Sequence, residues 1–312
     1  MQEKPASGRI ATYIICLNLG ILACKSNVSQ KSNPNLGRTI YDTTNIDVDD
    51  FVKDKNTQRK ILAMPWGEAV ARLGALEFRA SSTFIFSRGG REFAQNDTYT
   101  IQQDKSGNFY VRIANSAEQV ETYLINDTFY VRYDKGQFRR RLRRDIEPDV
   151  WCDRAYSSLN AILEVFNGAF AFVEAKTEKQ TAGSKRFDVR LSEDAERIPE
   201  LNAKDTLPIF PRARWRELAK PLDLKGSTWV DAKAGVITKI EMEGRLEMND
   251  REVRPTQMLV RYVGSITPLI QSVQPPAKSI PWIYRESPPK NPLHFFADSL
   301  PTTPANDPTA VR

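Results

Sequence analysis

The chain has 312 residues, of which 40% are hydrophobic and 27% are charged, and its formal net charge is +6. This length allows one large domain or two small ones, and the composition is typical of a globular domain with an apolar core. The basic excess is mild, and the aromatic residues lie at strand-core spacing and not in clusters with basic residues. These features argue against nucleic-acid binding.

Residues 1–23 have the features of a secretory signal peptide. Lys4 and Arg9 precede an apolar run over residues 10–23 that is shorter than the roughly 20 residues of an ordinary membrane-spanning helix. The tetrapeptide Ile21-Leu22-Ala23-Cys24 resembles the bacterial lipobox, in which the cysteine is acylated and becomes the new N-terminus. We therefore predict lipidation at Cys24. The alternatives are a signal peptide cut elsewhere and a short buried helix.

A polar segment follows the predicted lipidation site. We expect residues 24–60 to form a tether between lipid and domain, although residues 43–59 could instead include a short helix. In Gram-negative lipoproteins an Asp after the acylated cysteine commonly signals retention at the inner membrane. Lys25 stands at that position and favours the outer membrane, facing the periplasm.

The next part of the chain predicts one short helix and a run of strands. Residues 65–74 have Pro65 at the start, Gly74 at the end and an apolar helical face between them. The runs that follow alternate between apolar and polar residues and are separated by turn residues, which is typical of an antiparallel meander. Strands are predicted at 76–87, 98–103, 109–115, 119–125, 128–133 and 138–143.

The clearest alternation lies in residues 225–248. A strand at 227–231 and a turn at 232–235 lead into a long strand from Val236, and the strand around Tyr262 repeats the pattern. One face of the long strand is apolar and the other is charged, which predicts a one-sided, strongly curved antiparallel sheet with an apolar interior. The apolar face comprises Val236, Thr238, Ile240, Met242, Gly244, Leu246 and Met248.

Residues 154–174 interrupt the strands. Their apolar residues recur at three- and four-residue steps, which predicts a helix packed on the sheet, with a plausible break at Gly168. A strand is expected at 186–191 and irregular structure at 200–222.

The C-terminal tail, residues 268–312, holds ten of the nineteen prolines. It could be an extended segment docked on the sheet or a partner-binding motif, and we expect disorder from Pro301 onward.

The residues offer no recognisable catalytic or metal-binding constellation. His294 is the only histidine, which removes most Ser-His-Asp and Cys-His arrangements and any multi-histidine metal site. The acidic residues at 145–153 lack the glycine turn and closing glutamate of a calcium loop and are expected to flank a helix start. Cys152 follows Trp151 and is expected to be a buried thiol. We therefore predict no enzyme, no metal and no cofactor.

Residues 139–144 form the densest charge run. Arginines here could contact anionic lipid headgroups, but a solvated strand edge is the favoured interpretation. The arginines concerned are Arg139, Arg140, Arg141, Arg143 and Arg144.

The sequence at 123–141 (YLINDTFYVRYDKGQFRRR) and at 226–240 (GSTWVDAKAGVITKI), with the order of elements over residues 66–266, resembles the LolA/LolB/LppX group of periplasmic carriers and lipoproteins. The resemblance implies a half-closed antiparallel barrel whose concave side is plugged by helices. It also implies a hydrophobic cavity for acyl chains and no catalytic residues.

Together these observations predict an α+β, mostly β fold: a strongly curved antiparallel sheet, or half-open barrel, with helices plugging its concave face over residues 61–267. The predicted function is a membrane-anchored lipoprotein that binds a lipid or acylated ligand in a hydrophobic cavity. The alternative is a structural or assembly lipoprotein that binds an envelope protein through its sheet surface and tail. For each predicted lining residue, ordinary core packing is the competing interpretation. The predicted cavity lining is Phe84, Phe86, Val131, Trp229, Ile240, Met242 and Tyr262.

Overall fold

The computed structural model describes residues 41, 43–88, 90–116, 118–143, 147–166, 169–175, 183–192, 219–248 and 256–282. They belong to the second of two compact units, Ile40–Arg312. The predicted signal peptide, Cys24, Arg144, His294 and the tail beyond residue 282 lie outside the described residues.

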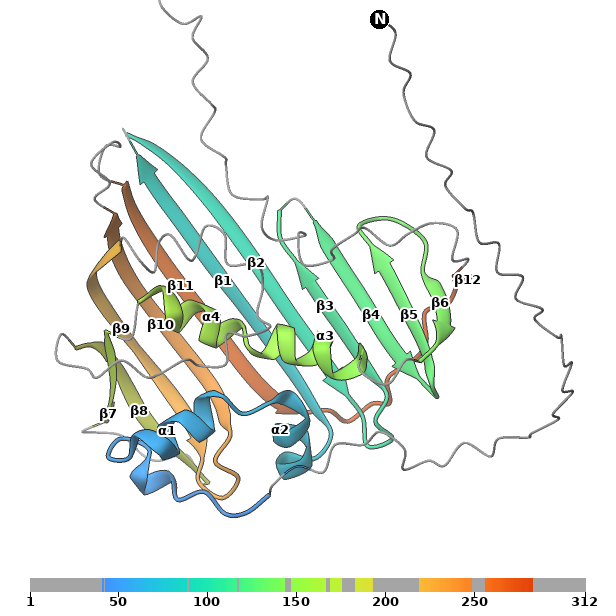
Figure 1. Cartoon of the computed structure of the whole chain (residues 1–312), viewed down its shortest axis with the longest axis horizontal. Helices are drawn as coiled ribbons and strands as arrows, with labels where there is room; N and C mark the ends of the chain where they lie inside the picture. The colour runs from blue at the N-terminus through green and yellow to red at the C-terminus, as the bar shows by residue number, and fades with distance from the viewer. Residues whose placement is uncertain are drawn as a thin grey trace, which may run out of the picture. The chain divides into compact units, whose positions relative to one another are not determined.

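The strands of the described residues form one twelve-stranded sheet that is not closed into a barrel (Figure 1). Its order is β12-β6-β5-β4-β3-β2-β1-β11-β10-β9-β8-β7, and its pairs are antiparallel except β12 with β6. The strands are β1 (Leu76–Arg88), β2 (Arg91–Gln103), β3 (Phe109–Ala114), β4 (Gln119–Ile125), β5 (Thr128–Tyr133), β6 (Arg139–Leu142), β7 (Phe170–Glu174), β8 (Ser184–Leu191), β9 (Ala219–Asp231), β10 (Ile237–Met248), β11 (Thr256–Pro268) and β12 (Ile280–Pro281).

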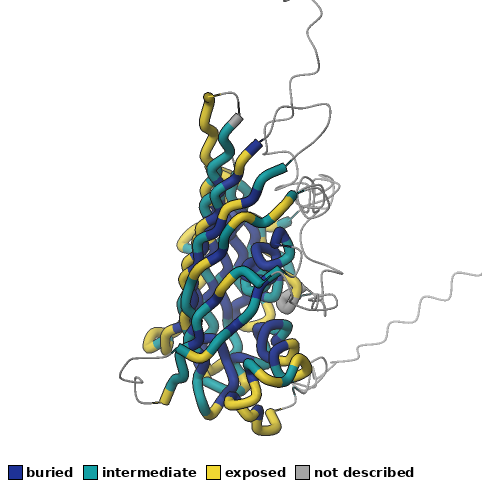
Figure 2. The backbone as a smooth tube through the Cα atoms, turned by 90° about the vertical axis from the view of Figure 1, so that its left-hand side faces the viewer, coloured by how far each residue is buried: buried dark blue, intermediate teal, exposed yellow. Residues whose placement is uncertain are grey.

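Helices cover one face of this sheet, which we call the inner face (Figures 1 and 2). They are the 3-10 turn η1 (Val48–Asp50) and the helices α1 (Lys55–Leu62), α2 (Trp66–Leu73), α3 (Glu147–Tyr156) and α4 (Ser158–Val165). The chain from β6 to β7 must pass from one end of the strand order to the other, and α3 and α4 make this crossing, in contact with β2, β3 and β11. The predicted fold class is confirmed.

Local sequence fixes the ends of the first two helices. The side chain of Asp54 caps α1 by accepting hydrogen bonds from the backbone N–H groups of Asn56 and Thr57. Pro65 precedes α2 and has no capping side chain, but Asp153 of α3 accepts a hydrogen bond from Trp66 N at 2.7 Å. One helix therefore caps another across the helix layer.

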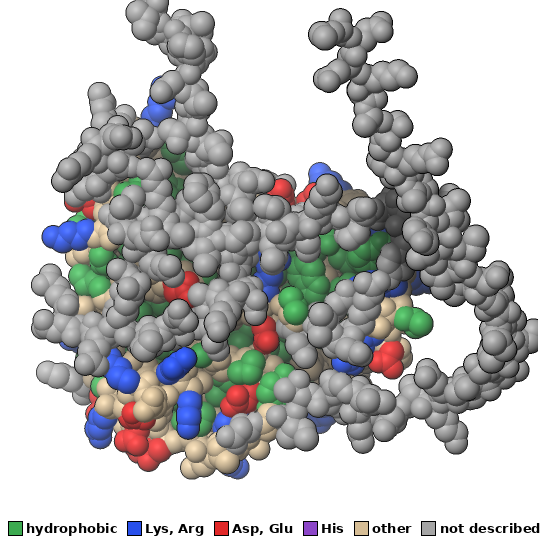
Figure 3. Space-filling view, viewed as in Figure 1, with side chains coloured by type: hydrophobic (Ala, Val, Ile, Leu, Met, Phe, Trp, Pro, Cys, Tyr) green, Lys and Arg blue, Asp and Glu red, His purple; other side chains and the backbone are tan. Residues whose placement is uncertain are grey.

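The core lies between the helix layer and the inner face. Every second residue of the strands points into the core from the sheet, and the apolar faces of the helices point into it from the other side. On the helix side of the molecule, charged side chains gather over α1 and α2, and hydrophobic side chains are visible over β4 and β5 (Figure 3). The largest fully buried side chains include Trp66, Tyr262, Phe51, Phe109 and Phe166.

The predicted tether is wrong for residues 43–60. Ile46, Val48 and Phe51 are buried, and Phe51 is 0% exposed. Its ring centroid lies 4.9 Å from the rings of both Phe172 and Phe187. The alternative of a short helix holds, since α1 begins at Lys55. These apolar residues stand among charges and look solvated in sequence, but the aromatic partners of Phe51 come from β7 and β8.

The predicted helix at 154–174 is also wrong in its second half. Two helices, α3 and α4, are followed by strand β7 at Phe170–Glu174, which pairs antiparallel with β8. Phe170 and Phe172 are both buried on the inner face at the two-residue period of a strand. The helix prediction instead relied on Phe166, Phe170 and Val173, which lie three and four residues apart. Only the pairing with β8 decides between the two periods.

Two strands are longer than predicted. β2 begins at Arg91 instead of residue 98, and β9 at Ala219 instead of residue 227. Both extensions pair with a neighbouring strand along their length, so the backbone hydrogen bonds hold polar sequence in the sheet.

The described part of the tail is an extended segment docked along the sheet. Val273 N donates to Asp104 Oδ2 at 3.1 Å, in the turn between β2 and β3. Ile280 N and Trp282 N then donate to the carbonyls of Phe138 and Arg140 at 2.9 and 2.8 Å. The segment thereby adds the short parallel strand β12 to the edge of β6.

Candidate functional site

Six of the seven predicted cavity residues lie on the inner face. Phe84, Val131, Ile240, Met242 and Tyr262 are buried there, and Phe86 packs beside them in a half-buried position. The strand register joins the central ones: Met242 pairs with Tyr262, and Phe84 and Phe86 follow Ser82, which pairs with Tyr262 from the other side.

Trp229 lies on the opposite, outer face, so its predicted place in the cavity lining is wrong. It pairs with Lys239, whose neighbour Ile240 points inward, and the register of β9 and β10 shifts between Ile237 and Lys239. The Trp229 ring lies 4.6 Å from Lys239 Nζ and 5.5 Å from the Arg186 guanidinium carbon. Cationic side chains, not the core, therefore pack against this ring.

A small cavity lies where the helix layer meets β1, β10 and β11. Its volume is about 30 Å³. A water molecule occupies about 30 Å³ of liquid, whereas ligand pockets usually measure about 300–1,000 Å³. Of the predicted lining, Ile240 and Tyr262 border it. Its other lining residues include Ile61, Leu62, Met64, Phe78, Tyr156, Leu159 and Asn160.

The helix side of this cavity is not among the residues predicted from the sequence. Asn160 lies in α4, where every other residue from Ser158 to Val165 except Glu164 is also buried. An amide within such an apolar helix was the available signal, because buried polar side chains need a hydrogen-bond partner or a role.

Two buried hydrogen bonds hold α4 in place. Ser158 Oγ and Tyr262 OH are 2.9 Å apart, and the two residues are 2% and 1% exposed. Asn160 Nδ2 donates to the Leu62 carbonyl at 2.9 Å. Burial raises the pKa of the Tyr262 phenol above its ordinary value, so this side chain stays protonated and able to donate. We call the Ser158–Tyr262 hydrogen bond the α4 latch.

The end of α4 packs directly on strand β10. A Cβ atom at Gly244 would lie 2.6 Å from the ring of Phe166, so the glycine makes room for the aromatic ring. Phe166 is fully buried. This contact fixes the far end of α4, as the α4 latch fixes its start.

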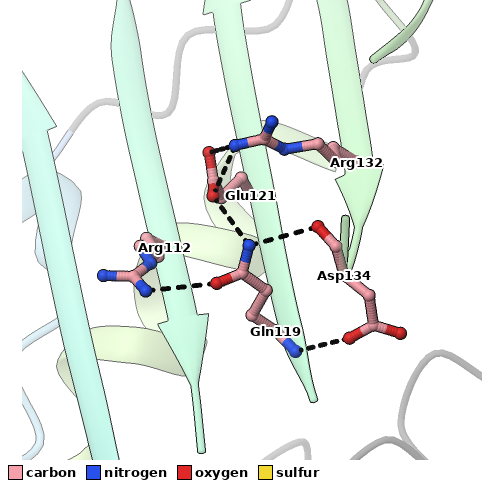
Figure 4. Close-up of polar contacts among 5 residues, drawn as sticks. All are labelled: Arg112, Gln119, Glu121, Arg132 and Asp134. Atoms are coloured by element: carbon pink, nitrogen blue, oxygen red, sulfur yellow. Dashed lines mark hydrogen bonds and ion pairs between the residues drawn. The ribbon is translucent and has the colours of Figure 1, made fainter. Parts of the chain in front are cut away.

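The outer face carries a paired polar cluster over β3, β4 and β5 (Figure 4). Glu121 is 6% exposed and accepts two hydrogen bonds from Arg132, at 2.7 and 2.8 Å. Gln119 Nε2 donates to Glu121 and to the Asp134 carbonyl, and its Oε1 accepts from Arg112. Because these hydrogen bonds occupy the Glu121 carboxylate and the Gln119 amide, the cluster is better suited to holding strands together than to acid–base chemistry.

A shallow open groove of about 650 Å³ lies further along the sheet, at β8 to β11. Ion pairs cross it: Glu243 lies 2.6 Å from Arg261 and 3.3 Å from Lys225, and Asp188 lies 3.6 Å from Arg190. Opposite charges therefore alternate over this part of the sheet.

The arginine run does not form a bare strand edge, because β12 pairs with Arg139 and Arg140. The Arg141 guanidinium carbon lies 5.0 Å from the Phe129 ring and 5.1 Å from the Trp282 ring. Arg140 donates to Ser279 Oγ at 3.3 Å. A further pair joins Arg143 to Asp127 at 3.8 Å. Contact of this run with anionic headgroups stays a prediction.

Other predicted features concern chemistry. Within the described residues no group of three or more His, Cys, Asp or Glu side chains could hold a metal ion. Cys152 is a buried thiol, as expected. Helix α3 begins at Glu147, so the acidic residues Glu147 and Asp149 do lie at a helix start. In the described part of the chain, no helix is both long and apolar enough to cross a membrane.

No protein-family model matches the sequence, and no curated protein sequence matches it. Among solved structures, it is similar to a DUF1329 family protein from Desulfovibrio piger, with 10% identity, a TM-score of 0.24, and coverage of 71% of this chain and 96% of that chain. It is also similar to a LolA superfamily protein from Nitrosomonas europaea, with 12% identity, a TM-score of 0.18 and coverage of 63% and 87%. A third is a putative outer membrane lipoprotein-sorting protein domain from Vibrio parahaemolyticus, with 9% identity, a TM-score of 0.17 and coverage of 68% and 88%.

The LolA superfamily is the group that the sequence resembles. All three TM-scores are below 0.5, so these structures indicate nothing about the function of this chain.

Proposed function

We propose that this protein is an envelope lipoprotein that binds the acyl chain of a lipid or lipidated ligand between the helix layer and the inner face. Acylated Cys24 would hold it at the outer membrane, facing the periplasm. The observation that carries the proposal is the cavity beneath α4, which has mostly apolar walls and a few polar groups, the usual character of a small-ligand site.

Binding at this site requires α4 to move. The cavity of about 30 Å³ is roughly a tenth of the smallest usual ligand pocket. The α4 latch and the packing of Phe166 on Gly244 hold the helix against the sheet. An acyl chain would enter by replacing these contacts with its own, as a lid opens on a binding site.

Native mass spectrometry with lipid extraction tests the proposal on the full chain carrying Cys24→Ser. We expect acyl lipid to co-purify without a covalent bond. Ile240→Phe should reduce its occupancy, because Ile240 borders the cavity. Glu241→Phe adds the same ring to the next residue, on the outer face, and serves as the control. A lipid-free protein that refuses added lipid, or equal occupancy in both variants, contradicts the proposal.

The alternative is an assembly lipoprotein that binds an envelope protein through its outer face. The charged groove at β8 to β11 favours it. Glu243→Lys would replace an anion that two cations approach, and should abolish such an association while leaving lipid content unchanged. Chemical cross-linking in intact cells with both forms of the protein measures this. A lipid-free protein with a cross-link that depends on Glu243 would support the alternative.

A further inference from the structure

The Asn160 side chain has a fixed orientation and one unsatisfied atom. Its Nδ2 donates to the Leu62 carbonyl at 2.9 Å, and a carbonyl can only accept, so the amide cannot be turned round. Asn160 is 7% exposed, and its Oδ1 has no hydrogen-bond partner among the described residues. Buried acceptors without a partner are rare in proteins and call for an explanation.

Asn160 borders the cavity beneath α4, and three polar side chains near it have hydrogen-bond partners. Ser158 Oγ and Tyr262 OH bond to each other. Thr238 Oγ1 donates to the Trp229 carbonyl at 3.3 Å. Among these four side chains, Asn160 has the acceptor atom without a partner, and a ligand donor would reach this buried atom when α4 moves.

We infer that Asn160 is a polar subsite that accepts a hydrogen bond from an N–H or O–H group adjoining the ligand's acyl chain. This inference rests on the proposed function and names its ligand more closely. An amide oxygen can accept but not donate, so an acyl group joined through an ester, which has no N–H or O–H, leaves Oδ1 unsatisfied. A chain joined through an amide N–H, or one that carries a hydroxyl, satisfies it.

The cavity has the size of the ligand's polar group alone, and the acyl chain needs the space that opens when α4 moves. Its volume of about 30 Å³ is that of one water-sized polar group. The apolar remainder of the ligand then lies against Met64, Phe78 and Ile240.

Two amide probes that differ in one N–H group test the contribution of the ligand's hydrogen-bond donor. N-methyldodecanamide has one N–H, and N,N-dimethyldodecanamide has none but is otherwise nearly identical. Isothermal titration of each into the full Cys24→Ser chain should show the N–H form binding about three- to tenfold more tightly, the usual worth of one neutral hydrogen bond. Asn160→Leu should remove this preference. Met64→Leu, which changes the same cavity but keeps the acceptor, should retain it.

The possible results distinguish failure of the Asn160 subsite from failure of acyl-chain binding. Equal binding of the two amides to the wild-type cavity overturns the Asn160 subsite while leaving acyl binding in place. Binding of neither amide overturns the proposed function, and the subsite with it. The comparison of the two probes needs no cavity variant, so it remains decisive if Asn160→Leu fails to fold.

Discussion

Removing one of the two hydroxyls of the α4 latch should destabilise the protein, because the other hydroxyl is then buried without a hydrogen-bond partner. Tyr262→Phe removes one hydroxyl and keeps the ring, leaving Ser158 Oγ buried without its partner at 2.9 Å. Loss of one partner from such a pair lowers the free energy of unfolding by about 1–3 kcal/mol. With a urea slope of about 2 kcal/mol per molar, a loss of about 2 kcal/mol lowers the unfolding midpoint by about 1 M.

Removing both partners should be less harmful than the two single changes imply. Ser158→Ala with Tyr262→Phe leaves no orphaned hydroxyl, so the double variant should be more stable than additivity predicts by about 1–2 kcal/mol. Urea unfolding followed by tryptophan fluorescence measures the four proteins of the cycle. Tyr130→Phe, on the outer face, is the control and should change stability by less than about 0.5 kcal/mol. Additive effects within about 0.5 kcal/mol would refute the buried hydrogen bond as the source of the coupling.

Three other changes test separate parts of the molecule. Arg132→Leu leaves the buried Glu121 carboxylate without its main partner. In urea titrations it should lower the free energy of unfolding by about 3 kcal/mol, and a loss below about 1 kcal/mol would contradict a buried ion pair. The hydrogen bond from Arg261 holds the pKa of Glu243 below its ordinary value of about 4.5, so the carboxylate's contribution is present above that pH and is lost as pH falls through the lowered pKa. The stability difference between wild type and Arg261→Gln should therefore shrink in acid, and a difference that is constant from pH 7 to pH 3 speaks against this pairing. Phe166→Ala should lower the free energy of unfolding by about 3–5 kcal/mol, because it leaves a void between α4 and β10. The urea midpoint should fall accordingly, and near-wild-type stability would mean that α4 does not depend on this ring.

Local sequence patterns were enough to predict the parts of the fold that depend on neighbouring residues alone. Alternation in β10 and β11 identified the inner face, and Pro65 and Gly74 marked α2 to within a residue. Such patterns are readable because side-chain direction follows a fixed period along one strand or helix. The same reasoning placed Ile240 and Tyr262 at the interior, where both border the cavity.

Tertiary structure alone decided the features that depend on distant partners. Phe51 is buried because β7 and β8 supply its aromatic neighbours, and residues 170–174 form a strand because β8 pairs with them. A register shift beside Trp229 accompanies its place on the outer face. The volume beneath α4 depends on how residues from α1, α4, β1, β10 and β11 meet, although they lie up to about 200 residues apart in the sequence. No local sequence period encodes this volume, because packing depends on the shapes of side chains that are distant in sequence.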